Sequence, residues 1–152
     1  MRIDGLTLDF FRNYLHLEAR FDPAVNVIYG ENAQGKTNLL EAVAYLSGLT
    51  HRSRYDKELI QFGVDRAFLK GEVFSRDRTF LLEAKLQRGV RRQLYANGVR
   101  LKSAGELPGI FQCVLFCPED LYLIRAGAAE RRKFLDECIC QLRPRYAAAL
   151  AE

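Results

Sequence analysis

Two glycines and a lysine stand at the start of an apolar run with helical spacing. The segment Ile28 to Ala42 reads IYGENAQGKTNLLEA, so Gly30, Gly35, Lys36 and Thr37 follow the spacing G-x-x-x-x-G-K-T. Glycine permits backbone angles and close approaches that a Cβ would forbid. The N–H groups of such a loop can turn toward phosphate oxygens, and the positive end of the following helix faces the same anion. The pattern therefore predicts a phosphate-binding loop of the Walker A type.

The side chains of this pattern have separate tasks. Lys36 reaches the β- and γ-phosphates, and the Thr37 hydroxyl is a Mg²⁺ ligand, so ATP with Mg²⁺ is the predicted ligand. The residues between the glycines contribute mainly their backbone groups; they are Glu31, Asn32, Ala33 and Gln34. For Asn38 two interpretations stay open, a helix cap and a contact on the α-phosphate side. The plain alternative is a glycine-rich turn with a surface lysine, which accounts neither for Thr37 nor for the strand-like run before the loop.

A strand and a helix must position this loop. The β-rich run AVNVIYG ends at Gly30, and apolar residues recur at helical spacing from Thr37 to a stop at Gly48. Alternation of apolar and polar residues predicts strands elsewhere, and Asn97-Gly98 predicts a tight hairpin. The predicted strands are 3–11, 15–21, 67–74, 79–87, 91–102 and 111–117, the last buried. The predicted helices are 57–61, a short one opening at 118, and 128–142 with one apolar face.

Positive charge is concentrated in one stretch of the chain. The 152 residues carry a net charge of +4, and the segment 85–102 holds six basic residues and no acid. These six residues are Lys85, Arg88, Arg91, Arg92, Arg100 and Lys102. Such a local patch suits an anionic partner such as DNA, and a solvated hairpin with long side chains is an equally good interpretation.

Length and composition limit the kind of protein that this chain can be. The chain is long enough for one domain with a real core. It has no apolar run that could span a bilayer and no apolar signal core at its start, so we expect a cytoplasmic protein that does not enter a membrane. Its cysteines are Cys113, Cys117, Cys138 and Cys140, and we expect reduced, buried thiols because Cys-x-Cys does not fit a zinc site.

Six segments together resemble the RecF family of bacterial recombinational-repair ATPases, which have ABC-type heads related to those of Rad50 and SMC proteins. These segments are FRNY at 11–14, GENAQGKTNLLEA at 30–42, SRYDKELIQFG at 53–63, NGV at 97–99, VLFCPEDL at 114–121 and GAAERRKFLD at 127–136. The resemblance implies ATP-dependent homodimerisation, slow hydrolysis, and binding to DNA at single-strand gaps and single-strand/double-strand junctions. It also implies a role in loading recombinase with RecO- and RecR-type partners, in DNA replication and in the SOS response.

The resemblance also implies a fold, and it indicates which motifs of the family this chain lacks. We expect an α/β P-loop NTPase, the N-terminal lobe of an ABC-type head, with the core in 1–66 and 103–152 and a β-rich antiparallel subdomain over 67–102. RecF proteins are longer, and their signature and Walker B motifs lie in the half that this chain lacks. We interpret Glu119-Asp120 as loop residues, so we expect an N-terminal fragment that binds ATP without hydrolysing it and holds no catalytic residue. The alternatives are a P-loop small-molecule kinase, another SMC- or Rad50-like head, and an interaction module that nucleotide only stabilises.

The resemblance assigns two further nucleotide contacts. In similar heads a basic residue just past the first strand contacts the phosphates, which suits the guanidinium of Arg12, with Asn13 beside it. A solvated turn is the alternative for this pair. For His51, Arg52 and Arg54 a solvated loop is the favoured interpretation, and an approach to the base or to DNA is the other.

Overall fold

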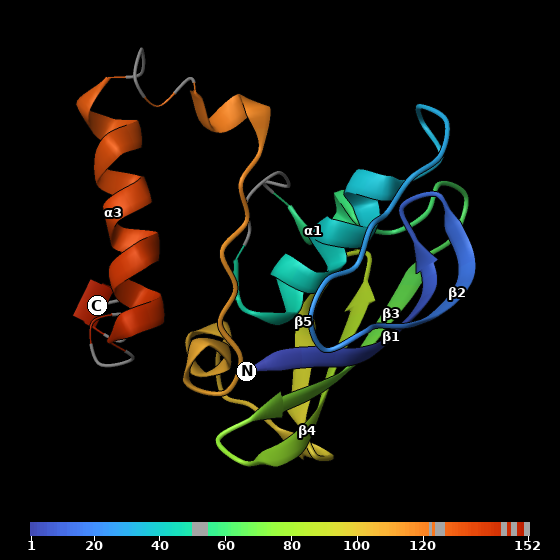
Figure 1. Ribbon diagram of the computed structural model, residues 1–152, viewed down its shortest axis with the longest axis horizontal. Coiled ribbons are helices and arrows are strands. Elements are labelled where there is room, and N and C mark those ends of the chain that lie inside the picture. Colours follow the sequence, from blue (N-terminus) through green and yellow to red (C-terminus); the bar gives the residue numbers. More distant parts are fainter. Residues whose placement is uncertain (50–54, 122, 124–126, 144–145, 147–148, 151–152) are drawn as a thin grey trace.

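The computed structural model contains one six-stranded antiparallel sheet with a helix packed on one face (Figure 1). It describes the chain apart from residues 50–54, 122, 124–126, 144–145, 147–148 and 151–152. The strands are β1 Arg2–Phe11, β2 Tyr14–Arg20, β3 Arg66–Ser75, β4 Arg78–Gln87, β5 Val90–Ala96 and β6 Val99–Arg100, in the spatial order β2-β1-β3-β4-β5-β6. The helices are α1 Lys36–Leu46 and α3 Ala128–Leu142, with short 3₁₀ turns η1 Asp56–Glu58, η2 Ala104–Gly109 and η3 Pro118–Leu121.

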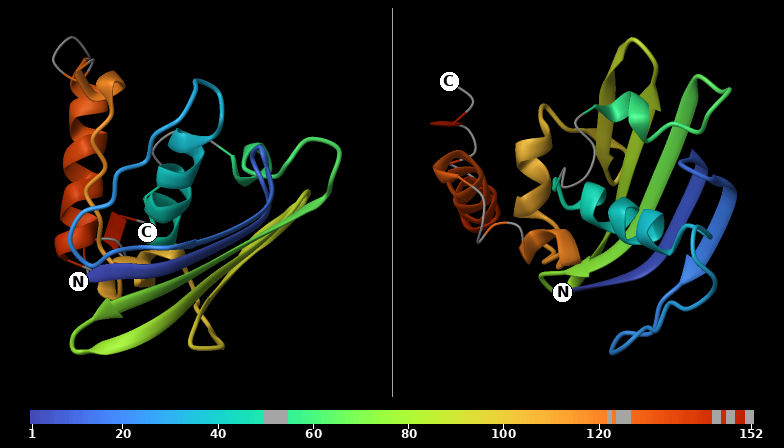
Figure 2. Two further views of the ribbon diagram at one scale, coloured as in Figure 1. Left: turned by 45° about the vertical axis from the view of Figure 1, so that its right-hand side comes forward. Right: turned by 90° about the horizontal axis from the view of Figure 1, so that it is seen from above.

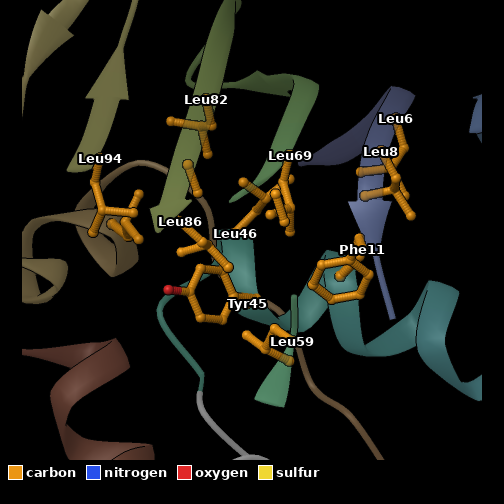
Figure 3. Close-up of a cluster of buried hydrophobic side chains, with 14 of the residues drawn as sticks. Leu6, Leu8, Phe11, Tyr45, Leu46, Leu59, Leu69, Leu82, Leu86 and Leu94 are labelled. Carbon is orange, nitrogen blue, oxygen red and sulfur yellow. The ribbon is translucent and has the colours of Figure 1, made fainter. Parts of the chain in front are cut away.

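The core lies between α1 and the face of the sheet that curves around it (Figure 2, left). Figure 3 shows Tyr45 and Leu46 of α1 among leucines from β3, β4 and β5. Gly71 of β3 lets the helix come close, because a Cβ there would lie 2.7 Å from Cδ1 of Leu46. Each leucine that is fully buried in this way contributes ~1.5–3 kcal/mol to the free energy of unfolding.

Strict alternation in β3 and β4 sets which face is buried. Leu69 and Val73 of β3, and Leu82 and Leu86 of β4, are at most 2% exposed and face α1. The residues between them face the other side of the sheet, which no described helix covers. Because the side-chain period of a strand is two, the intervening residues of β3 and β4, such as Phe68 and Lys85, lie on the outer face.

The predicted hairpin is confirmed. Asn97 and Gly98 join β5 to β6 with φ of +50° and +76°, as a type I′ turn requires. Arg76 and Asp77 make the β3–β4 turn with φ of +52° and +61°, although neither is a glycine or an asparagine. The ten paired residues on either side hold this turn, whose sequence gives no hairpin signal.

Two predicted strands are wrong. The run 24–29 and the run 111–117 have no ladder partner among the described residues. Several of their apolar side chains are exposed: Val25 76%, Val27 78%, Tyr29 89%, Val114 97% and Phe116 76%. Only Phe111 and Cys117, at the ends of the second run, are buried. A β-rich composition makes a strand only where another strand pairs with it, and the described residues supply none here.

The C-terminal helix has the predicted bounds, but its apolar face is not buried. The helix α3 spans Ala128–Leu142 and none of its residues is buried. Phe134, Leu135 and Leu142 of the apolar face are 48%, 56% and 73% exposed. In Figure 1 this helix stands beside the sheet rather than on it, and its contacts are mainly with η2.

The strands of 67–102 are not a separate sheet. Leu6 and Leu8 of β1 pair with Gly71 and Leu69 of β3, so the N-terminal hairpin and the later strands form one surface. The division at 67 and 102 stays a prediction, and it does not correspond to a break in the sheet.

Candidate functional site

The predicted phosphate loop is a tight bend whose amides are free. Three of its residues have positive φ: Gly30 at +146°, Ala33 at +65° and Gly35 at +101°. The backbone N–H groups of residues 31–35 donate no hydrogen bond to another backbone group of the described chain, and residues 31–34 are exposed. Successive N–H groups in such a bend form a concave site for an anion. Gly35 is also the N-cap of α1 and has no side-chain capping bond, so the first amides of the helix face the same concavity.

Lys36 lies across the loop. Its Nζ donates to the carbonyl oxygens of Gly30 at 2.8 Å and Glu31 at 2.6 Å. The ammonium therefore lies at the mouth of the bend, where a phosphate oxygen can replace a carbonyl oxygen as its acceptor. Thr37 follows on the first turn of α1 and is exposed, which leaves its hydroxyl open to a cation.

The segment FRNY packs against the end of this loop. A Cβ on Gly35 would lie 2.6 Å from Oδ1 of Asn13 and 3.0 Å from the Tyr14 hydroxyl, so only glycine fits. Tyr14 Oη donates to the Gly35 carbonyl at 3.0 Å, and Asn38 Nδ2 donates to Asn13 Oδ1 at 2.9 Å. Burial raises the pKa of Tyr14, so the phenol, a donor at neutral pH in any case, also stays a donor at more alkaline pH. Asn13 and Asn38 therefore connect β1–β2 to the helix start, and the cap of α1 is Gly35 rather than Asn38.

Tyr14 is a site residue that sequence reasoning missed. Its only signal was its place in FRNY, directly before the predicted strand 15–21, and in the structure it is the first residue of β2.

Arg12 is bound to the protein in this structure. Its Nε and one terminal nitrogen donate to the two carboxylate oxygens of Glu41 at 2.9 and 2.8 Å, and the other donates to the Glu58 carbonyl at 2.8 Å. Glu41 is 7% exposed, and Arg12 holds φ of +55°. The predicted phosphate contact stays a prediction, and it would require the guanidinium to leave Glu41. Sequence reasoning also missed Glu41, because a single acidic residue within the predicted helix carries no local signal of its partner.

The six basic residues of the predicted DNA patch do not form one surface in the structure. Lys85 and Arg91 are exposed and line a groove on the outer face of the sheet. Arg88 donates to the carbonyl oxygens of Val64 and Gln61, and so holds the β4–β5 turn. Arg100 is an exposed residue of β6. Lys102 lines a polar cavity near η2.

Arg92 is the member of the patch that faces inward. It donates to Asp56 Oδ1 at 2.9 Å, and Tyr45 Oη donates to the same oxygen at 2.9 Å. Burial raises the pKa of Tyr45 far above its usual range. These three residues join α1, η1 and β5, so Arg92 is a structural residue here, while its assignment to DNA stays untested.

Cys113, Cys117, Cys138 and Cys140 form no disulfide. Cys117 is buried and the other three are half-buried, and Ser47 Oγ lies 3.1 Å from Cys113 Sγ. No group of three metal-ligating side chains occurs among the described residues. His51, Arg52 and Arg54 lie outside the described residues. Across the part of the chain that the structure describes, no helix has the length and apolar character needed to cross a membrane.

Comparison with known proteins agrees with this geometry. The model of a family described as AAA domain matches residues 6–107. The DNA replication and repair protein RecF of Agathobacter rectalis is 44% identical over the whole chain, which covers 42% of that protein. A solved structure of the recombination mediator protein RecF with ATP matches 99% of this chain and 42% of its own, with a TM-score of 0.93 and 38% identity.

A more distant structure shows the fold alone. An SMC ATPase structure covers 90% of this chain and 98% of its own, with a TM-score of 0.68 and 20% identity. The α/β fold of a P-loop ATPase head, predicted from the sequence, is therefore confirmed. The chain spans about two fifths of the length of the curated relatives that it matches. Residues 6–107 show that the chain belongs to the AAA domain family, and the RecF relatives confirm the resemblance read from its sequence.

Proposed function

We propose that this chain binds ATP through the loop 30–37. The observation that carries the proposal is the bend with three positive φ angles and unpaired amides, closed by the ammonium of Lys36. The site fits a nucleoside triphosphate because its donors are backbone N–H groups and one cation, the ammonium of Lys36. Its exposure leaves room for the base and sugar outside the bend.

Magnesium fits the same site. Thr37 offers an exposed hydroxyl one residue after Lys36, and oxygen is the ligand that Mg²⁺ prefers. One protein oxygen with phosphate oxygens and water is a common set for this ion in phosphate-binding sites. When bound, the ion would neutralise part of the phosphate charge.

We propose further that the full-length protein is a RecF-type DNA-repair ATPase in the cytoplasm. It would bind DNA at single-strand gaps and junctions, dimerise with ATP, hydrolyse it slowly, and act with RecO- and RecR-type partners to load recombinase during replication and the SOS response. The support is the identity to RecF proteins over the whole chain. These activities belong to the whole protein, of which this chain matches about two fifths.

Hydrolysis is proposed to need residues outside this chain. Asp120 accepts a hydrogen bond from the Cys117 N–H at 2.6 Å, so it caps η3 and belongs to a turn, as expected. The unpaired run 24–29 directly precedes the nucleotide loop, and the unpaired run 111–117 directly precedes the turn at η3. We propose that strands of the remaining lobe pair with both runs and bring the signature and Walker B groups to the loop.

The test is ATP binding by point variants in the full-length protein. Lys36→Ala should abolish binding of a fluorescent ATP analogue, whereas Lys57→Ala, an equal loss of charge on η1, should retain it. Thr37→Ala should remove the stimulation of binding by Mg²⁺, and Thr37→Ser should restore it. Unchanged ATP affinity in Lys36→Ala would refute the proposed loop function. Phosphoryl transfer to a nucleoside or sugar would favour the kinase alternative.

A further inference from the structure

A groove lies on the outer face of the sheet, away from α1. Its cavity volume is about 520 Å³, within the ~300–1,000 Å³ of ligand pockets. A row of paired residues crosses it from β1 to β5: Asp9, Phe68, Lys85 and Gln93. Each of them neighbours a residue that is buried against α1, so by strand alternation the row points to the opposite side of the sheet.

Positive charge exceeds negative charge in this groove. Arg66, Lys85 and Arg91 line it and are exposed. Arg66 and Arg91 form no ion pair with any residue that the structure describes, and Lys85 Nζ lies 4.9 Å from the centre of the Tyr95 ring. The one carboxylate of the lining, Asp9, is hydrogen-bonded to His16 at 2.6 Å. The groove is therefore suited to a partner with several negative charges.

Two aromatic rings lie among these cations. Phe68 is half-buried in the middle of the row, and Phe10 lines the groove with 39% of its surface exposed. An acidic peptide would use only the charges of such a groove. A single nucleic-acid strand would use both the charges and the aromatic rings, because its unstacked bases offer flat faces to the rings while its phosphates bind the cations. The bases of a duplex are already stacked on each other and have no free face.

We infer that this outer-face groove binds a segment of single-stranded DNA. Bases stack on Phe68 and Phe10, and phosphates bind Arg66, Lys85 and Arg91. The inference rests on the proposed DNA-repair function. It adds the site on the protein, the preference for a single strand over a duplex, and three contact residues outside the basic stretch 85–102, namely Phe10, Arg66 and Phe68. The test therefore separates failure of the groove from failure of DNA binding itself.

The experiment measures fluorescence anisotropy of an oligo(dT) strand and a blunt duplex of equal length, with the full-length protein, ATP and Mg²⁺. Phe68→Leu should weaken oligo(dT) binding about tenfold and leave duplex binding unchanged. Phe74→Leu is the matched control, because Phe74 lies on the same strand and face, outside the groove. Circular dichroism melting shows that both variants are folded.

A charge variant tests the same site without changing an aromatic residue. Arg66→Gln should lower the slope of log affinity for oligo(dT) against log salt by about 0.7. Arg78→Gln removes the same charge from the other end of the sheet and should not change the slope.

The groove is excluded if wild-type protein binds DNA while Phe68→Leu and Arg66→Gln both bind like wild type. An equal loss for strand and duplex in Phe68→Leu overturns base stacking. Displacement of oligo(dT) by polyglutamate of matched charge at equal concentration assigns the groove to acidic protein segments instead. If the wild type binds no DNA, the proposed function fails, and this inference fails with it.

Discussion

Replacing Gly35 with alanine tests the geometry of the phosphate loop directly. Two costs arise from different parts of the structure. The backbone φ of +101° strains any residue with a Cβ by ~1–3 kcal/mol. The new Cβ would also lie 2.6 Å from Asn13 Oδ1 and 3.0 Å from the Tyr14 hydroxyl, so both side chains must move.

The second cost can be estimated from two hydrogen bonds. Asn38 donates to Asn13 at 2.9 Å and Tyr14 donates to the Gly35 carbonyl at 3.0 Å. Each such bond contributes ~0.5–1.5 kcal/mol net, so losing both costs ~1–3 kcal/mol. Together with the backbone strain, Gly35→Ala should lower the free energy of unfolding by ~2–6 kcal/mol. It should also abolish ATP binding, because the amides of the bend lose their arrangement.

Gly89→Ala is the matched control. Gly89, in the β4–β5 turn, has φ of +71°, and a Cβ there would have no heavy atom within 4 Å. It should therefore show the strain alone, ~1–3 kcal/mol, and retain ATP binding. Urea unfolding followed by circular dichroism, with titration of a fluorescent ATP analogue, measures both effects. Equal destabilisation by the two variants, or normal ATP affinity in Gly35→Ala, would refute the close packing of FRNY on the loop.

Two further predictions concern groups that hold α1 in place. Arg12→Ala leaves the Glu41 carboxylate buried without its bidentate partner, so the free energy of unfolding should fall by about 3 kcal/mol, and the double variant Arg12→Ala/Glu41→Gln should recover part of this loss. Arg2→Ala, the control at an exposed ion pair, should cost at most ~1 kcal/mol. An equal loss in Arg12→Ala and Arg2→Ala would contradict the stabilising role of the Arg12–Glu41 ion pair. Tyr45 has a pKa raised by burial, so above about pH 10 the unfolded chain loses a proton that the folded chain keeps. Stability from this group is therefore intact below that pH and falls as the pH rises; urea unfolding in alkaline buffers should show a smaller fall in Tyr45→Phe, and an unchanged pH dependence contradicts the assignment.

Residues close in sequence determined much of this protein. The spacing of Gly30, Gly35, Lys36 and Thr37 predicted the bend and the helix after it, because backbone freedom and a helix start are local properties. Asn97-Gly98 predicted its hairpin for the same reason. The bounds of α3 also followed from its sequence, whereas its burial did not.

Tertiary structure alone decided which distant groups meet. Arg12 is 29 residues from Glu41 in sequence, and no local pattern predicts that their side chains pair. The place of β1 between β2 and β3 brings Asp9, Phe68 and Lys85 into one groove, while the turns and the inward face of β5 take Arg88 and Arg92 away from it. The β-rich runs 24–29 and 111–117 stayed unpaired because a strand needs a partner, and a partner is a property of the assembled fold rather than of a segment.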